Sequence, residues 1–349
     1  MWRNGGFTMI FGKDFGIDLG TSNVIIYMRG KGIVLREPAV VAVDKNTGKL
    51  LGVGLEAQKM LGRTPGNIIA IGPLQDGVIS DYEMTERMLR EFIRKITSFS
   101  LLKPRLLITI PGSITEVQER AVIDAGMQAG ARKVFLMEEA VAAAYGAGLD
   151  ISQPAGRMLI DIGGGTTDIA VLSLSGVVEY GSVNVAGKSF DEAIIKYVKR
   201  KHSILIGERT AEDIKIKLGC VYHNERDESM EVRGRCMLTG LPKMFTIHSE
   251  EMLDAFTDVT EDLLDAIRGV LEKTPPELVA DIAVNGITVA GGGSLVRGID
   301  KLIEANTNIK TRVADDPETC AALGAGKALE WINDMQEGTI NIARRRRMM

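Results

Sequence analysis

Two segments of the chain place an aspartate before a glycine-rich turn that carries hydroxyl groups. They are Asp18-Leu-Gly-Thr-Ser-Asn23 and Asp161-Ile-Gly-Gly-Gly-Thr166. Each follows one β-prone apolar run and precedes another, which predicts strand, tight turn, strand. Glycines let backbone N–H groups close on phosphate oxygens, and an aspartate can hold Mg²⁺ through water. The spacing therefore predicts two phosphate-binding hairpins.

The two hairpins are about one domain's length apart, which indicates a duplicated domain. A chain of 349 residues also suggests about two domains on length alone. A nucleoside triphosphate held by two related halves is the simplest use of such an arrangement.

Composition excludes several classes of function. Lys and Arg number 42 against 46 Asp and Glu, a net charge of −4, so no basic field favours nucleic acid. Cys220, Cys236 and Cys320 lack C-x-x-C spacing, and their odd number fits reduced thiols. The three histidines show no zinc-ligand spacing. A zinc site is therefore not expected.

No apolar run reaches the about 18 residues of a membrane span, and no signal-peptide pattern opens the chain, so we expect a cytoplasmic protein. Both ends nevertheless combine apolar and basic residues. Trp2 and Phe7 lie near Arg3, and four arginines at 344–347 precede two methionines. Such pairings can touch an anionic bilayer. The alternatives are a lead-in strand at 7–11 and a solvated tail.

Hydrophobic periodicity predicts helices separated by short strands, an α/β pattern throughout. The predicted helices cover 55–61, 81–96, 115–129, 140–147, 190–201, 210–218, 249–272, 296–305 and 320–335. The predicted strands outside the two hairpins lie within 34–53, 105–111, 134–137, 182–185, 231–247 and 286–290. Thr210, three residues before Asp213, is expected to cap its helix.

Five segments occur in one order along the chain. They are Asp18–Thr21, Glu139–Gly148, Asp161–Asp168, Ala290–Leu295 and Ala322–Gly326. Together they resemble the phosphate 1, connect 1, phosphate 2, adenosine and connect 2 motifs of the actin, sugar kinase and heat-shock chaperone ATPase superfamily. Each motif alone is weak, but all five in order are specific.

Further segments narrow the resemblance to the MreB family of bacterial actins, which includes close paralogues such as Mbl. They are Arg29–Ile33, Asp76–Tyr82, Ile206–Glu212, Glu272–Leu278 and Gly291–Gly298. The likeness covers roughly residues 14–332. It implies an α/β fold of duplicated actin-like (ribonuclease H-like) domains around a central nucleotide cleft.

The resemblance also implies four subdomains. The first core subdomain comprises 1–32 and 80–149, with a small insertion at 33–79. The second core subdomain comprises 150–185 and 255–349, with a small insertion at 186–254.

Carried onto this sequence, the resemblance assigns catalytic roles. Asp18 and Asp161 match the acids that position Mg²⁺ through water. Glu139, selected over Glu138 by the spacing that follows it, matches the residue that orients or activates the attacking water. Thr166 is expected near that water or the γ-phosphate. Asp168 stands where relatives have Glu and is a candidate outer-shell acid.

The nucleotide-binding residues follow from the same resemblance. The phosphate loops comprise Gly20, Thr21, Ser22 and Asn23 in the first half and Gly163, Gly164, Gly165 and Thr166 in the second. Glu212 and Lys215 match a pair that touches ribose and adenine, although an ordinary i,i+3 surface ion pair is the alternative. Gly291, Gly292 and Gly293 match the adenosine motif, against a plain strand-to-helix turn.

The loop at 98–104 places Leu101 and Leu102 beside a lysine. The resemblance implies that such a loop inserts apolar side chains into the inner leaflet. The alternative is that the two leucines cover the core beneath the next strand.

The implied function is an ATP- and Mg²⁺-dependent protein that assembles with itself into filaments and hydrolyses ATP slowly. The resemblance places it peripherally at the inner face of the cell membrane, with transmembrane cell-wall elongation proteins as partners and a role in rod cell shape. Three rivals share the fold or the ligand. They are a small-molecule kinase, a chaperone-type ATPase, for which no substrate-binding domain is evident, and a non-hydrolysing nucleotide-binding scaffold.

Overall fold

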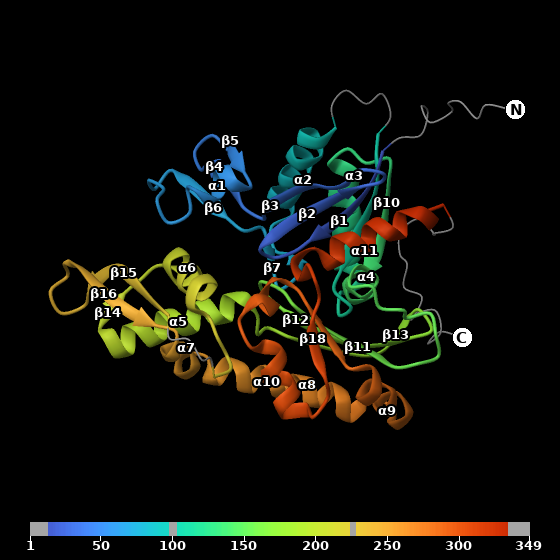
Figure 1. Ribbon diagram of the computed structural model, residues 1–349. Coiled ribbons are helices and arrows are strands. Elements are labelled where there is room, and N and C mark those ends of the chain that lie inside the picture. Colours follow the sequence, from blue (N-terminus) through green and yellow to red (C-terminus); the bar gives the residue numbers. More distant parts are fainter. Residues whose placement is uncertain (1–12, 98–102, 224–227, 334–349) are drawn as a thin grey trace, which may run out of the picture. The chain divides into compact units, whose positions relative to one another are not determined.

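The computed structural model describes residues 13–97, 103–223 and 228–333 and divides into two compact units (Figure 1). Unit 1 contains the described parts of Met1–Ile110, Ile114–Ala142 and Ala322–Asn341. Unit 2 contains Pro111–Ser113 and the described part of Ala143–Ala321.

The main sheet of unit 1 has five strands in the order β10-β9-β1-β2-β3. They are β1 (Asp14–Leu19), β2 (Asn23–Met28), β3 (Gly32–Pro38), β9 (Arg105–Ile110) and β10 (Lys133–Glu138). β1, β2 and β3 form an antiparallel meander, whereas β1, β9 and β10 run parallel. β9 is apolar on both faces and almost wholly buried, as expected of a central parallel strand.

Helices α2 (Tyr82–Ile96) and α3 (Glu116–Gln128), both predicted as helices, pack against each other and against this sheet (Figure 1). The Asp81 side chain caps α2 by accepting from the Met84 N–H at 3.0 Å. Thr115 and Gln118 form a capping box at α3. The stripe that α2 buries consists of Met88, Leu89, Phe92 and Ile93.

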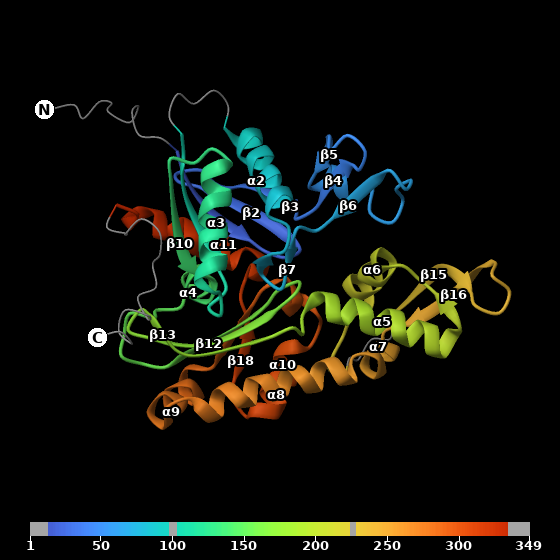
Figure 2. The ribbon, with the colours of Figure 1, turned by 180° about the vertical axis from the view of Figure 1, so that it is seen from behind.

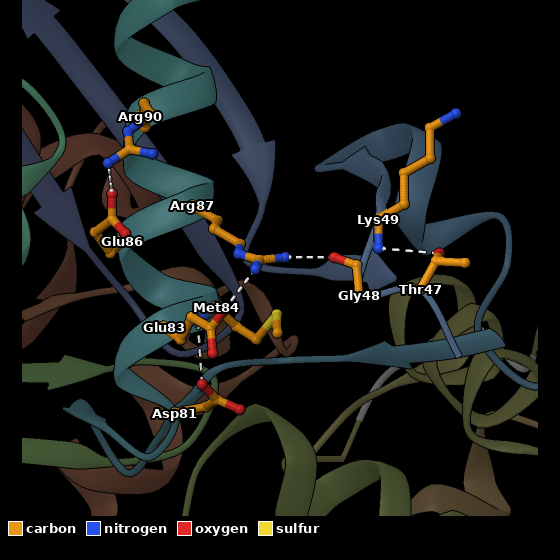
Figure 3. A network of polar contacts seen from close by, with 9 residues as sticks. All are labelled: Thr47, Gly48, Lys49, Asp81, Glu83, Met84, Glu86, Arg87 and Arg90. Carbon is orange, nitrogen blue, oxygen red and sulfur yellow. Dashed lines mark hydrogen bonds and ion pairs between the residues drawn. The ribbon is translucent and has the colours of Figure 1, made fainter. Parts of the chain in front are cut away.

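A smaller sheet in unit 1 has the order β5-β4-β6. It is built from β4 (Val41–Asp44), β5 (Leu50–Val53) and β6 (Ile68–Ile71), with the one-turn helix α1 (Leu55–Gln58) beside it. Arg87 of α2 donates to the Gly48 carbonyl at 2.7 Å, across the β4–β5 turn (Figure 3). Glu37 accepts from Lys95 Nζ at 2.9 Å and from the Leu55 N–H at 2.8 Å.

The main sheet of unit 2 repeats the topology of unit 1. Its order is β13-β12-β11-β17-β18, with an antiparallel β11-β12-β13 meander and a parallel β11-β17-β18 run. The strands are β11 (Arg157–Ile162), β12 (Thr167–Ser173), β13 (Gly176–Val183), β17 (Ile287–Ala290) and β18 (Thr311–Val313). The predicted α/β fold with a duplicated domain is confirmed.

Helices and a second small sheet complete unit 2 (Figure 2). The helices are α5 (Gly187–His202), α6 (Glu208–Leu218), α7 (Glu250–Ala255), α8 (Thr257–Lys273), α9 (Pro276–Asn285) and α10 (Ile299–Thr307). The small sheet is β14 (Ile204–Leu205), β15 (Ser229–Cys236) and β16 (Pro242–His248). α5 packs on α6 and on β14.

Three sequence-based expectations about unit 2 are wrong. The helix predicted over 249–272 is broken at Phe256, whose fully buried ring sits between α7 and α8. α9 was not predicted, although Pro276 occupies its favourable first position. α6 begins at Glu208 behind Gly207, so Thr210 lies inside the helix and does not cap it.

Two helices carry the chain across the division between the units. α4 (Glu139–Gly146) passes from unit 1 into unit 2, and α11 (Cys320–Ala328) returns. Their unit 2 ends touch, because a Cβ on Gly146 would lie 1.8 Å from the Cys320 carbonyl oxygen. In unit 1, a Cβ on Gly326 would lie 2.4 Å from the Tyr27 ring. Glycine at both positions permits this close packing.

Candidate functional site

The first predicted hairpin is β1–β2, with Asp18 near the end of β1. Thr109 of the neighbouring β9 donates to Asp18 Oδ1 at 3.3 Å. Burial raises the pKa of Asp18 to about 6, although the Thr109 hydrogen bond favours the charged form. A Cβ on Gly20 would lie 2.9 Å from the Asn23 carbonyl oxygen, so the turn is too tight for a side chain there.

Thr21 and Ser22 of this turn are held by other parts of unit 1. The buried Thr21 Oγ1 accepts from the Gly77 N–H at 2.9 Å, and the Ser22 carbonyl accepts from Ala39 at 2.8 Å. Gly77 lies in the turn between β7 (Leu74–Gln75) and β8 (Val78–Ile79). No site pattern in the sequence includes Gly77. The Asp-Gly dipeptide, in which both residues have positive φ, could have indicated a hairpin.

Glu139 begins α4 directly after β10. β1, β9 and β10 run parallel, with Ile17 beside Ile108 and Glu138 beside Ile110. The carboxyl ends of these strands therefore meet at one edge of the sheet, which brings Asp18 and Glu139 to the same side of unit 1. This is the edge at which parallel α/β sheets usually bind ligands.

The second hairpin, β11–β12, is closed by a hydrogen bond from the Gly163 N–H to the Thr166 carbonyl at 2.9 Å. Asp161 is the register partner of Asp168 on β12 and of Ala290 on β17. Both aspartates are buried. The segment Gly291–Gly293 follows β17, so it lies at the same edge as Asp161 and the phosphate loop.

Gly291 touches the loop directly. A Cβ there would lie 2.3 Å from both Asp161 Oδ1 and the Ile162 carbonyl oxygen, and Gly291 has φ +80° and ψ 157°. Any other residue would clash and be strained. Gly293 is similarly close to Ile162, at 2.4 Å from Cγ2. Unit 2 therefore brings together the predicted phosphate loop and the predicted adenosine segment.

The N-terminus of α5 also holds this loop. The N–H groups of Gly187 and Lys188 donate to the carbonyls of Gly163 and Gly164 at 3.0 and 2.9 Å. Lys215 of α6 reaches the same place, where its Nζ donates to the Gly187 carbonyl and to Asp191, each at 2.9 Å. Lys215 is thus ion-paired with Asp191, on another helix.

Asp191 was not identified from the sequence, because no local pattern links it to Lys215. Burial raises its pKa to about 6 and outweighs the opposing effect of Lys215, while Glu212 and Glu208 raise it further. The predicted residue Glu212 therefore lies close enough to influence the Asp191–Lys215 pair.

Each unit, taken by itself, offers donors that fit a magnesium nucleotide. Within 13–97, 103–223 and 228–333, no group of three or more His, Cys, Asp or Glu side chains could hold a metal ion. Mg²⁺ usually binds one or two carboxylates together with substrate phosphates and water. Asp18 and Asp161 each supply one carboxylate beside a glycine-rich turn of the kind that binds phosphate.

The predicted membrane contacts cannot be placed. Trp2, Phe7, Leu101, Leu102 and the arginines at 344–347 lie outside the described residues. Among the residues that are described, no helix is both long and apolar enough to cross a membrane.

Comparison with known proteins gives concordant matches. A family model described as MreB/Mbl protein matches residues 12–337. The cell shape-determining protein Mbl of Bacillus cereus is 52% identical over 325 residues, which are 93% of this chain and 98% of the relative. The cell shape-determining protein MreB of Escherichia coli K12 is 48% identical over 340 residues, 96% and 98% of the two chains.

A solved structure is also similar. The crystal structure of MreB 5 of Spiroplasma citri bound to AMPPNP matches with a TM-score of 0.89 and 38% identity, over 93% of this chain and 97% of that one. The similarity supports the actin-like fold that the family resemblance implies.

Proposed function

Because the chain belongs to the MreB/Mbl family, we propose that it is an ATP-binding, actin-like protein whose filaments organise cell-wall synthesis and rod cell shape. The observation that carries the proposal is the repeated hairpin. Each unit has an aspartate and a glycine-rich turn at the carboxyl edge of a five-stranded sheet of the same topology. The similar structure of MreB 5 contains AMPPNP, an ATP analogue, which favours ATP as the nucleotide.

The proposed reaction is slow hydrolysis of ATP to ADP and phosphate. Bound Mg²⁺ would neutralise phosphate charge, with Asp18 and Asp161 holding it through water. Glu139 would orient or activate the attacking water, and Thr166 would contact that water or the γ-phosphate. Backbone N–H groups of 20–23, 164 and 165 would bind phosphate oxygens, while the Gly163 N–H closes the turn. Glu212, Lys215 and Gly291–Gly293 would contact the nucleoside.

We infer filament formation and membrane attachment from the family to which the chain belongs. A filament presents many copies of each weak contact, so modest membrane affinity per subunit is multiplied along it. We propose Leu101 and Leu102, with Trp2 and Phe7, as the apolar contacts. Transmembrane cell-wall elongation proteins are the expected partners.

Sedimentation tests this proposal. The purified chain is centrifuged with and without anionic liposomes, in Mg-ATP and without nucleotide, and the pellets are viewed by negative-stain microscopy. We expect filaments that form with Mg-ATP and bind liposomes. A chain that stays soluble in all conditions would contradict the filament claim and favour the kinase or scaffold alternatives.

Two variants separate the parts of the proposal. Leu101→Ser/Leu102→Ser should lose liposome binding, whereas Val284→Ser, which removes an 86% exposed side chain from α9, is the control.

Glu139→Ala should bind ATP but release phosphate much more slowly. Normal release by Glu139→Ala would contradict the role given to that carboxylate.

A further inference from the structure

A buried carboxylate in unit 2 lies beside the phosphate loop, and the proposed hydrolysis gives it no role. Asp168 of β12 is 3% exposed and is the register partner of Ser182 on β13. Tyr180 is two residues before Ser182 on the same strand, so it projects from the same face of the sheet. The opposite face, with Ile169 and Val171, belongs to the apolar core.

Asp168 accepts hydrogen bonds from several hydroxyl groups. Thr166 Oγ1 donates to Asp168 Oδ2 at 3.3 Å, and the Tyr180 hydroxyl donates to Asp168 Oδ1. The Ser182 side chain also bonds to it. Burial raises the pKa of Asp168, whereas the hydrogen bonds from these hydroxyls favour its charged form. In that form the carboxylate only accepts, so each hydroxyl that bonds to it is the donor.

Tyr180 is held in place at its ring as well as its hydroxyl. A Cβ on Gly112 would lie 2.9 Å from Tyr180 Cε2, so the ring packs on the backbone of Pro111–Ser113, which belongs to unit 2. Burial and the neighbouring Asp168 charge raise the pKa of Tyr180, which keeps the phenol protonated and therefore a donor.

The hydrogen bond to Asp168 decides whether the Thr166 hydroxyl can donate to a ligand or accept from it. A hydroxyl has one proton to donate and two lone pairs that accept. Once Thr166 donates to Asp168, its oxygen can only accept from a ligand. An accepting hydroxyl suits a water molecule, which has protons to donate, and does not suit a fully ionised phosphate oxygen.

We propose that Asp168 and Tyr180 are positioning residues that commit the Thr166 hydroxyl to accept a hydrogen bond from the attacking water. Tyr180 fixes Asp168, Asp168 fixes the Thr166 proton, and Thr166 orients the water. The inference rests on the proposed ATP hydrolysis and selects the water over the γ-phosphate as the partner of Thr166. It also gives Asp168 a role other than metal binding.

The test uses the full chain and single-turnover hydrolysis of ATP. Tyr180→Phe removes one hydroxyl and keeps the ring on Gly112. Its control is Tyr197→Phe, which removes a tyrosine hydroxyl bonded to Lys201 at 2.7 Å on α5 of the same unit. We expect Tyr180→Phe to slow hydrolysis about tenfold, as for loss of one hydrogen bond to a charged group. Nucleotide affinity and magnesium dependence should match the control.

A double-mutant cycle distinguishes positioning from a general structural effect. If Tyr180 acts through Thr166, Tyr180→Phe should add no further loss in a Thr166→Val background. Asp168→Asn tests the middle member and should slow hydrolysis at least as much as Tyr180→Phe. Losses that multiply in the double variant, or a Tyr180→Phe rate equal to wild type, would overturn the inference.

The same assay separates the inference from the proposed function. A wild-type chain that binds ATP and never releases phosphate would overturn the proposed hydrolysis and the positioning role together. An active wild type with an unimpaired Tyr180→Phe would overturn only the positioning role. A raised magnesium requirement in Asp168→Asn, without one in Tyr180→Phe, would return Asp168 to the role of an outer-shell metal ligand and also overturn the inference.

Discussion

At the scale of single residues, two glycines of unit 2 differ in whether their surroundings leave room for a side chain. Gly291 has a backbone conformation open almost only to glycine and packs on Asp161 and Ile162. Gly269 lies within α8, and a Cβ added there would meet nothing within 4 Å. A methyl group should therefore be harmful at the first position and helpful at the second.

We expect Gly291→Ala to lower the free energy of unfolding by about 1–3 kcal/mol or more, because strain and a clash with a buried carboxylate add. Gly269→Ala should raise it by about 0.5–1 kcal/mol, since alanine loses less backbone entropy in a helix. Urea unfolding measures both. Equal effects of the two substitutions would mean that Gly291 can move away from Asp161 freely.

Local spacing identified the residues of the two loops, because an aspartate, glycines and hydroxyls within six positions are visible in any single sequence. Their supporting residues were not visible in that way. Tyr180 lies on the neighbouring strand, 12 residues from its partner Asp168. Asp191 lies on another helix, 24 residues from its partner Lys215. Gly77 reaches Thr21 from a separate hairpin, at a separation of 56 residues. Such partners follow only from the fold.

At the scale of elements, Arg87 links α2 to the small sheet of unit 1. Arg87 donates to the Gly48 carbonyl in the β4–β5 turn and also pairs with Glu83 on its own helix (Figure 3). Arg94 lies on the same helix, but its side chain is 77% exposed and pairs with Glu91 one turn away. The two arginines offer a matched comparison.

We expect Arg87→Met to raise amide hydrogen exchange in β4 and β5 severalfold, because the turn loses its link to α2. Exchange in β1 and β9 should not change. Arg94→Met should leave all four strands as they are, since an exposed i,i+3 pair contributes little. If exchange in β4 and β5 is identical in the two variants, the hydrogen bonds of Glu37 alone are enough to hold the small sheet against α2.

Element boundaries show where periodicity is a weak guide. The pattern predicted α2 and α3 well because each has a side-chain cap, and α2 also has a clear apolar stripe. The pattern predicted one continuous helix across Phe256. In the structure two helices meet at this buried aromatic ring, and no glycine or proline in the sequence marks the break. The pattern passed over α9, which has a single fully buried side chain, Ile282, and so only a faint stripe.

At the scale of the whole molecule, duplication explains why two short hairpin motifs predicted a repeated domain. The same strand order and directions occur in both main sheets, each with its hairpin leading into a parallel run. A turn at the carboxyl edge in one unit therefore has a counterpart in the other. The division into four subdomains with the boundaries given above remains a prediction.

The proposed function requires both hairpins to respond to one ligand. Adding Mg-AMPPNP to the full chain, at a concentration where nothing pellets, should slow amide hydrogen exchange in residues 20–23 of unit 1 and 163–166 of unit 2. The turn at Leu174–Ser175 joins β12 to β13 at the opposite edge of the unit 2 sheet and should not change. Bound ligand stabilises the segments that it contacts and the states in which they are folded. Protection of one hairpin alone would contradict a site built from the duplicated motif, because the second copy would then have no phosphate to bind.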